Sequence, residues 1–296
     1  MRVQRDGRNV TVEVRADGDG VVSHAGSALV ALIADKSGLT GALSAGLEGL
    51  RRRRSGHDPG RVIRDLAVML ADGGDCLADL GAVRDQGALF GCVTSDSTAF
   101  RVIAQIACMP GLLDALAGEH ARAREYVWKQ AAAPERVIID IDATLVTAHS
   151  EKEGAAGTFK GGYGFHPLMA YCDETGDALA AILRPGNAGS NTATDHIAVI
   201  EQALEQIPAA HIRDSEILVR ADSAGATHDL LAFCREGRLR YSVGFELSEQ
   251  VRAAILNVAE DSWIASLATD STPRPNGQIV EITDLLDLDS WPQGHA

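Results

Sequence analysis

The sequence predicts an α/β fold, a mixed β-sheet with helices on its faces, and three observations support this prediction. Residues 136–142 run from branched apolar side chains straight into an Asp-Ile-Asp sequence, which is typical of a buried central strand. Two apolar runs, residues 165–171 and 178–183, flank a polar turn that contains glycine, as in a β-hairpin. A helical repeat over 192–206 precedes another branched strand over 216–220, and this alternation predicts a crossover that returns to the sheet.

The residues before this sheet are expected to form a small hairpin followed by short helices. Thr and Val alternate over residues 9–15, and an Ala-Asp-Gly-Asp-Gly sequence separates them from Val21-Val22, so we expect a hairpin within residues 1–24. Apolar residues then recur at helical spacing up to residue 130, interrupted by glycine and proline. No pattern within these helices indicates catalysis.

The later segments complete the predicted sheet. Five glycines within residues 154–164 indicate a loop that is either flexible or in close contact with another backbone segment. A helix is expected over 227–236 and a strand over 240–245, and a further strand over 278–283 is expected outside this sheet. Right-handed crossover packing places the strand over 216–220 beside the strand over 136–142.

Two acids of the first strand and one after the crossover strand are the candidate chemical groups. Asp140 and Asp142 project from the same face, one pleat apart, and their burial is costly unless a cation compensates the charge. They indicate either a strand end that reaches solvent or a metal-binding or nucleophilic pair. Asp222 follows the neighbouring strand, so Asp142 and Asp222 are expected to converge. Carboxylate oxygens suit hard cations, Mg²⁺ above all.

Composition narrows the class of protein. The net charge of −14 argues against a broad nucleic-acid-binding surface. A local basic run, Arg51-Arg52-Arg53-Arg54, is either a DNA contact or a charged helix end before a turn. The odd number of cysteines, without a Cys-x-x-Cys pair, indicates a reducing cytoplasm and no disulfide framework. The absence of a basic apolar leader and of a long apolar run predicts a soluble intracellular protein with no membrane partner.

Several stretches, in order along nearly the whole chain, are similar to bacterial insertion-sequence transposases of the DDE type, and in particular to the insertion-sequence thirteen-eighty family. The stretches that carry this resemblance are H-D-P-G-R-V-I-R-D-L-A (57–67), T-S-D-S-T-A-F-R (94–101), D-I-D-A-T-L-V (140–146), F-K-G-G-Y-G-F-H-P-L (159–168), L-R-P-G-N-A-G-S-N (183–191) and V-R-A-D-S-A-G (219–225). The resemblance implies a mainly helical region over 1–130 that binds DNA ends, an RNase H-like core over 131–245, and the start of a β-rich insertion over 246–296.

The resemblance also implies the catalytic acids. Asp142, followed by Thr144, corresponds to the first acid and Asp222 to the second, with Asp140 as a neighbour that could also bind metal. The third acid is a Glu on a helix beyond the insertion. Residues 246–296 contain no helix of that kind, so we expect a chain that is truncated, lacks the third acid and has impaired or no activity.

The implied cofactor is Mg²⁺ or Mn²⁺, and the implied partners are the terminal inverted repeats and target DNA, bound by a homodimer. The expected location is the cytoplasm, at the nucleoid when DNA is bound. Besides the arginine run, four residues around the proposed site are candidate DNA contacts: Lys160, His166, Arg184 and Asn187.

Two other functions are compatible with the residues. A haloacid-dehalogenase-type phosphatase has an Asp-x-Asp-Gly-Thr-Leu sequence after an apolar strand, and here Asp140 would be its nucleophile and Asp142 its general acid. Ala143 in place of the glycine, the long region before the strand and the hairpin after it argue against that function. The other possibility is a non-catalytic transposase remnant that binds DNA.

Overall fold

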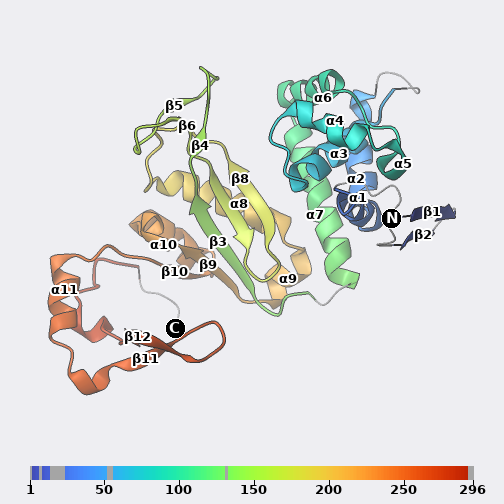
Figure 1. Cartoon of the computed structure of the whole chain (residues 1–296). Helices are drawn as coiled ribbons and strands as arrows, with labels where there is room; N and C mark the ends of the chain where they lie inside the picture. Colours follow the sequence, from blue (N-terminus) through green and yellow to red (C-terminus); the bar gives the residue numbers. More distant parts are fainter. Residues whose placement is uncertain (1, 7–8, 14–23, 52–55, 131–132, 293–296) are drawn as a thin grey trace. The chain divides into compact units, whose positions relative to one another are not determined.

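A computed structural model describes residues 2–6, 9–13, 24–51, 56–130 and 133–292 (Figure 1). The chain forms two compact units. The first comprises residues 1–133 together with 205–211, and the second comprises 134–204 together with 212–296.

The first unit begins with a hairpin of β1 (Arg2–Asp6) and β2 (Asn9–Glu13), which are antiparallel with Asp6 opposite Asn9. The partner of residues 9–13 is therefore the strand before them, not Val21-Val22 as predicted; residues 14–23, which include Val21-Val22, lie outside the described residues. Helices follow in the order α1 (Ser27–Lys36), α2 (Leu39–Gly46), α3 (Pro59–Ala71), α4 (Leu80–Arg84), α5 (Gly87–Phe90), α6 (Asp96–Cys108) and α7 (Leu112–Gln130), with 3-10 turns at Glu48–Leu50 and Leu77–Asp79.

The helices of the first unit enclose an apolar core. Leu47, Val62 and Leu80 are almost fully buried at its centre. Helix α3 begins where sequence chemistry favours a helix start: the Asp58 side chain accepts a hydrogen bond from the Arg61 amide, and Pro59 occupies the first turn. Burial of the apolar face of α3 against α2 and α1 then fixes how these helices cross.

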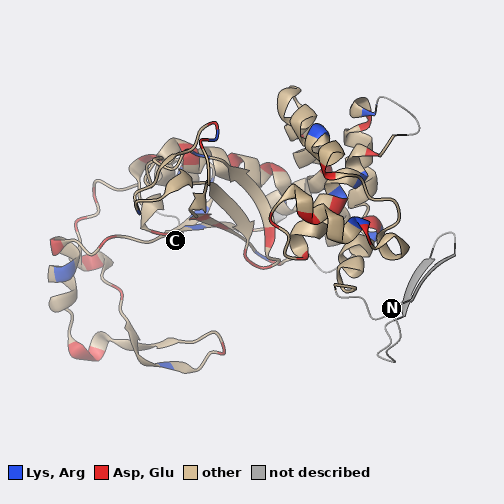
Figure 2. Ribbon diagram, turned by 45° about the horizontal axis from the view of Figure 1, so that its top comes forward, with Lys and Arg blue, Asp and Glu red and all other residues tan. Residues whose placement is uncertain are grey.

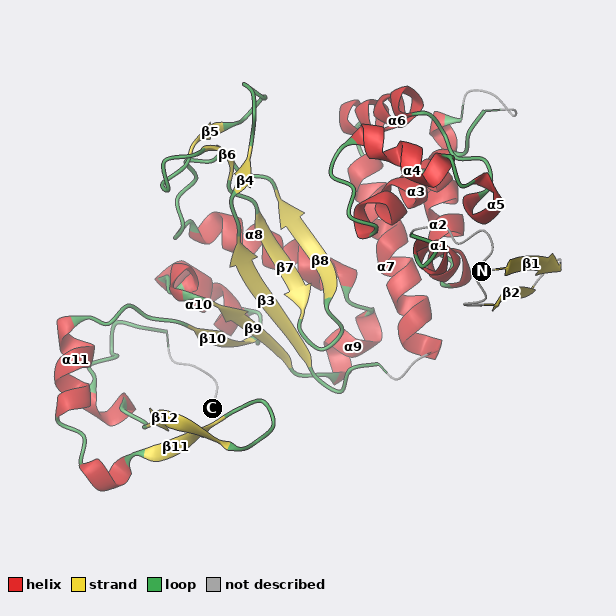
Figure 3. Cartoon of the chain, in the orientation of Figure 1, coloured by secondary structure: helices red, strands yellow, loops and turns green. Residues whose placement is uncertain are grey.

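The second unit is built on a five-stranded mixed sheet, which confirms the predicted α/β class (Figure 3). The strand order is β10-β9-β3-β7-β8, formed by Arg240–Val243, Ile217–Ala221, Val137–Ala143, Leu168–Cys172 and Asp177–Ile182. Strand β3 runs parallel to β9 and antiparallel to β7, and β9 runs parallel to β10. The predicted neighbour relation between the first strand and the crossover strand is therefore confirmed.

The two faces of β3 have opposite character. Val137, Ile139 and Ile141 are buried, whereas Asp140 and Asp142 alternate with them on the other face. Helix α8 (Ala193–Gln206) lies behind β3, β7 and β8 in Figure 3 and buries its own apolar stripe, which includes Val199, Ile200 and Ala203. The face that carries the aspartates is therefore opposite the α8 face.

Two short helices complete the crossover region. Helix α9 (Ala209–Asp214) precedes β9, and α10 (His228–Glu236) leads from β9 to β10. The Thr227 side chain caps α10 by accepting a hydrogen bond from the Leu230 amide. Leu230, Leu231 and Cys234 are its buried residues.

Two segments differ from the sequence predictions. The glycine-rich segment expected to be a loop contributes to a three-stranded sheet, β4-β6-β5, formed by Val146–Thr147, Tyr163–Phe165 and Ala156–Gly157. Glycine permits this pairing, because a Cβ on Gly164 would lie 2.0 Å from the Val146 carbonyl oxygen. The insertion segment begins with a helix, α11 (Glu249–Leu256), and its hairpin consists of β11 (Ile264–Leu267) and β12 (Pro273–Ile279), so the predicted strand over 278–283 lies mostly too late.

All five cysteines are free thiols, as their spacing predicts. Within the described residues, no single helix has the length and hydropathy needed to cross a membrane. The pairs α1–α2 and α6–α7 meet the length and composition criteria only when joined across bends of 67° and 103°.

Candidate functional site

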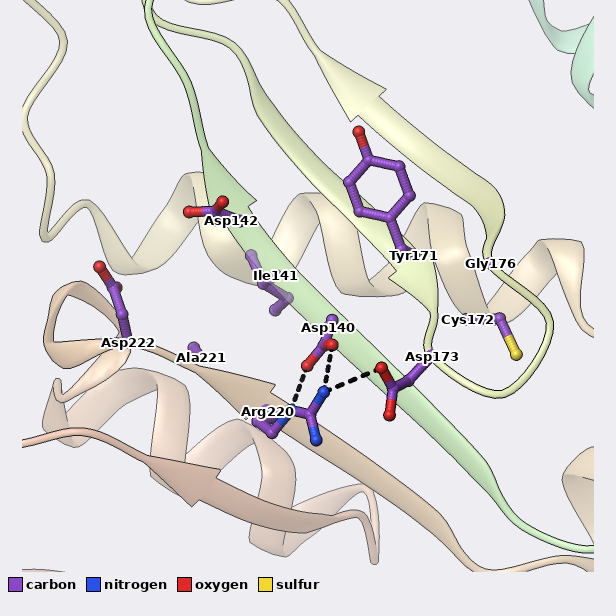
Figure 4. A pocket seen from close by; sticks show the side chains of 10 residues that line it. All are labelled: Asp140, Ile141, Asp142, Tyr171, Cys172, Asp173, Gly176, Arg220, Ala221 and Asp222. Atoms are coloured by element: carbon purple, nitrogen blue, oxygen red, sulfur yellow. Dashed lines mark hydrogen bonds and ion pairs between the residues drawn. The ribbon is translucent and has the colours of Figure 1, made fainter. Parts of the chain in front are cut away.

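The register of β3 and β9 brings two of the predicted acids together at the carboxyl ends of these neighbouring strands. Asp140 lies opposite Arg220 and Ile141 opposite Ala221, so Asp142 and Asp222 are the next residues of two parallel strands (Figure 4). Both acids line an open hollow of about 500 Å³, as do Asp140, Asp173 and Arg220. Two segments that are eighty residues apart in sequence therefore supply one group of carboxylates.

Asp142 and Asp222 are exposed and have similar local environments. The Ala143 amide donates to Asp142 Oδ1 at 2.8 Å, and the Ala224 amide donates to Asp222 Oδ1 at 2.9 Å. In the part of the chain that the structure describes, no Lys, Arg or His pairs with either carboxylate. Each acid thus has one oxygen oriented by the backbone and a second oxygen available to a ligand.

Asp140 has a different environment. Arg220 Nε and Nη2 donate to the two carboxylate oxygens of Asp140, and Arg220 Nη2 also lies 3.0 Å from Asp173 Oδ1 (Figure 4). The hydrogen bond to Asp140 is the main cause of a raised pKa at Arg220. Sequence reasoning did not select Arg220 or Asp173. The signal was present, however, because Asp140-x-Asp142 and Arg220-x-Asp222 have the same spacing on strands predicted to be neighbours.

The donor set of Asp142 and Asp222 fits a divalent cation. Hard cations such as Mg²⁺ and Mn²⁺ prefer carboxylate oxygens and keep several waters, so an open hollow with two converging carboxylates suits them. These two acids are the residues in the hollow that could hold such an ion without displacing an arginine.

Two of the four candidate DNA contacts near the site are buried in the protein. Arg184 is 3% exposed, and its guanidinium donates to the His166 and Gly189 carbonyl oxygens at 3.0 and 3.1 Å and to Asp195 Oδ2 at 3.1 Å. His166 is 5% exposed, with Nδ1 3.3 Å from the Ala188 carbonyl oxygen. These contacts hold together the segment before α8, which supports a structural role for both residues.

The remaining candidate DNA contacts are either exposed at the surface or outside the residues that the structure describes. Lys160 and Asn187 are exposed, and Lys160 Nζ lies 5.6 Å from the centre of the Phe159 ring. Arg51 is exposed and lies 4.0 Å from the Asp58 carboxylate, whereas Arg52, Arg53 and Arg54 lie outside the described residues. Figure 2 shows acidic residues beside basic ones along both units.

Arg184→Met is expected to lower the free energy of unfolding by about 2 kcal/mol, because it leaves buried acceptors without their donor. Lys160→Met, at an exposed cation, is the control and is expected to change it by less than about 0.5 kcal/mol. Denaturant-induced unfolding of both variants measures the difference. Equal stability of the two variants would contradict the structural role of Arg184.

The phosphatase alternative is not favoured by this geometry. A nucleophilic Asp140 needs a free carboxylate oxygen, yet both of its oxygens accept from Arg220. The neighbour of β3 in the sheet, β7, is also antiparallel to it and forms a hairpin with β8.

Comparison with known proteins identifies the family. The family described as Transposase DDE domain group 1 matches residues 4–294. Among solved structures, the Mos1 transposase paired-end complex with left transposon end is 11% identical, with a TM-score of 0.24, and the alignment covers 64% of this chain and 60% of that chain. A pre-cleavage Mos1 transpososome is 11% identical with a TM-score of 0.25, covering 64% and 61%.

The chain thus spans about 60% of the length of the Mos1 transposase chains that it matches. No curated protein matches it. With TM-scores this low, the assignment rests on the family match, which extends over nearly the whole sequence. This chain therefore belongs to the DDE transposase domain family, group 1.

Proposed function

We propose that this chain is a transposase of the insertion-sequence thirteen-eighty type that cleaves and transfers DNA strands at insertion-sequence ends with Mg²⁺ or Mn²⁺. The core that carries the reaction is RNase H-like. The observation that supports this proposal most strongly is the placement of Asp142 and Asp222, side by side at the carboxyl ends of two parallel strands and without a cation partner among the described residues. Family membership supplies the class of reaction.

The residues of the site suit phosphoryl transfer. Asp142 and Asp222 would hold a divalent ion there, and that ion would supply activation of a water or 3′-hydroxyl group and stabilisation of the departing 3′-oxygen. Asp142 and Asp222 provide carboxylate oxygens from two strands, and the Ala143 and Ala224 amides fix the orientation of each carboxylate. The openness of the hollow allows a DNA backbone to reach both acids, because Asp142 and Asp222 are exposed.

The substrates are the terminal inverted repeats and the target DNA, bound by a homodimer, and the place of action is the nucleoid. The helical region over 1–130 binds the DNA ends, with the arginine run at 51–54 as its basic contact. Lys160 and Asn187 are exposed and provide further contacts. A few local phosphate contacts of this kind are compatible with an acidic chain, since affinity depends on the cations at the interface.

Cleavage by this chain is expected to be weak. Of the described residues that line the hollow, the acids are all aspartates, and Arg220 already neutralises Asp140. Two free carboxylates hold a metal ion less firmly than the three acids of a complete DDE site. We therefore propose that the third acid, a glutamate in related transposases, is not supplied by this part of the chain.

The test is a paired assay on DNA duplexes that carry the two ends of the encoding insertion sequence. Gel shift without metal measures binding, and strand cleavage with Mn²⁺ measures chemistry, for the native chain and for Asp222→Asn. Slow cleavage that Asp222→Asn abolishes would support the proposal. Cleavage that survives in this variant would overturn the site, and end-specific binding with no cleavage at all would favour the non-catalytic remnant.

A further inference from the structure

We propose that Arg220, Asp140 and Asp173 form a positioning network that sets the register of the two metal-binding acids and offsets their mutual repulsion. This inference rests on the proposed function of Asp142 and Asp222. It gives Asp140 the role of a partner for Arg220 and takes it out of the set of metal ligands.

The Asp140–Arg220 ion pair and the acid pair lie next to each other along the same two strands, β3 and β9. Asp140 and Arg220 are register partners on β3 and β9, and Asp142 and Asp222 each follow two residues later. Side chains two residues apart share a face, so the ion pair lies one pleat, about 7 Å, from the acid pair. Figure 4 shows both levels on the face of the sheet that is turned away from α8.

The contact geometry makes Arg220 a rigid link between strands. Its Nε and Nη2 bind both oxygens of Asp140, a two-point contact that fixes the guanidinium plane. Nη2 also reaches Asp173, which directly follows β7, the neighbour of β3 on its other side. One side chain therefore ties together β9, β3 and the end of β7. A slip between β3 and β9 would break this contact and also separate Asp142 from Asp222.

The charge balance supports the same role. Four aspartates line the hollow, and Arg220 is the only cation among the described residues that do so. With two carboxylates already bound, Arg220 carries no surplus positive charge for a DNA phosphate. Its charge instead lowers the formal charge of the hollow from −4 to −3, so it reduces the repulsion among the four aspartates, and like charges opposite one another destabilise a pair of strands.

A charge swap distinguishes positioning from metal ligation. Asp140→Asn removes one of the two carboxylates that bind Arg220 and makes the hollow less negative, so it is expected to weaken Mn²⁺ binding about tenfold. The double variant Asp140→Arg/Arg220→Asp recreates the pair with the charges exchanged, and the arginine at 140 keeps Asp173 within reach from the next strand. Isothermal titration with Mn²⁺ should then show native affinity to within about threefold, because the total charge is unchanged.

The control is Arg240→Gln. It removes another partly exposed ion pair, between Arg240 and Glu216, which bridges β10 and the start of β9 at the other end of the strands. Mn²⁺ affinity should stay native in this variant. Failure of the charge swap to recover binding, with a folded protein, would overturn the network and return Asp140 to the metal ligands.

A thermal double-mutant cycle tests the network without metal. Asp142→Asn relieves the repulsion between the acids, so it should raise Tm by about 1–3 °C more in an Arg220→Gln background than in the native chain. Equal shifts in the two backgrounds would overturn the coupling. A native chain that binds no Mn²⁺ but shows the coupling would instead overturn the proposed metal site and leave the network standing.

Discussion

Replacing Asp142 or Asp222 by asparagine is expected to weaken Mn²⁺ binding at least about 100-fold. The reason is that each acid supplies half of the anionic oxygen ligands that the site has free, since Arg220 occupies Asp140. Replacement of a residue that only orients a metal ligand typically lowers metal affinity 10–100-fold, and replacement of a ligand itself lowers it more. Asparagine keeps the size of the side chain and one of its oxygens, so a loss of Mn²⁺ affinity is due to the missing negative charge and not to a change of shape.

The matched control is Asp261→Asn, which removes the same charge from an exposed position in the insertion segment. Titration calorimetry with Mn²⁺ on the three variants and the native chain makes the comparison, and circular dichroism verifies that each is folded. Unchanged affinity in Asp142→Asn or Asp222→Asn would contradict the site, and an equal loss in Asp261→Asn would show that net charge alone controls binding.

The convergence of these two acids could be predicted from sequence because it depends on few physical rules. Branched apolar runs identify β3 and β9, and the handedness of the crossover makes them neighbours. Asp142 is the second-last residue of β3 and Asp222 directly follows β9, so the two acids lie close together when the strands are neighbours. No knowledge of side-chain packing is needed for this step.

The matching spacing of Asp140-x-Asp142 and Arg220-x-Asp222 suggests a partner for Asp140, but it does not establish the contact. Arg220 was within the strand that sequence reasoning identified, but which side chains meet across two strands depends on register to a single residue, and a shift of one residue turns every side chain to the other face. The glycine-rich segment was predicted only in part for a related reason. Close approach at Gly164 was one of the two predicted alternatives, but the strand pairing of β4 and β5 with β6 depends on register and was missed.

The second large effect is expected at Gly60, where alanine should lower the free energy of unfolding of the first unit by about 3 kcal/mol, a fall in Tm of about 10 °C. A Cβ at this position would lie 2.2 Å from the Ser44 nitrogen and 2.5 Å from the Leu43 carbonyl carbon. These are backbone atoms of α2, so neither can rotate away. Relief requires α3 to move off α2, which would expose apolar surface around Leu43 and Val62.

Gly118→Ala makes this prediction specific to the helix contact and not to glycine in general. Gly118 is exposed on α7, and beyond the backbone of α7 itself nothing lies within 4 Å of the Cβ that alanine would add. Alanine there should raise stability by about 0.5–1 kcal/mol through helix propensity alone. In thermal unfolding, Gly60→Ala is thus expected to lower Tm and Gly118→Ala to raise it, although both place alanine in a helix of the same unit. Two shifts of the same sign would mean that α3 does not approach α2 this closely, because propensity favours alanine at both positions and only a steric clash can reverse it.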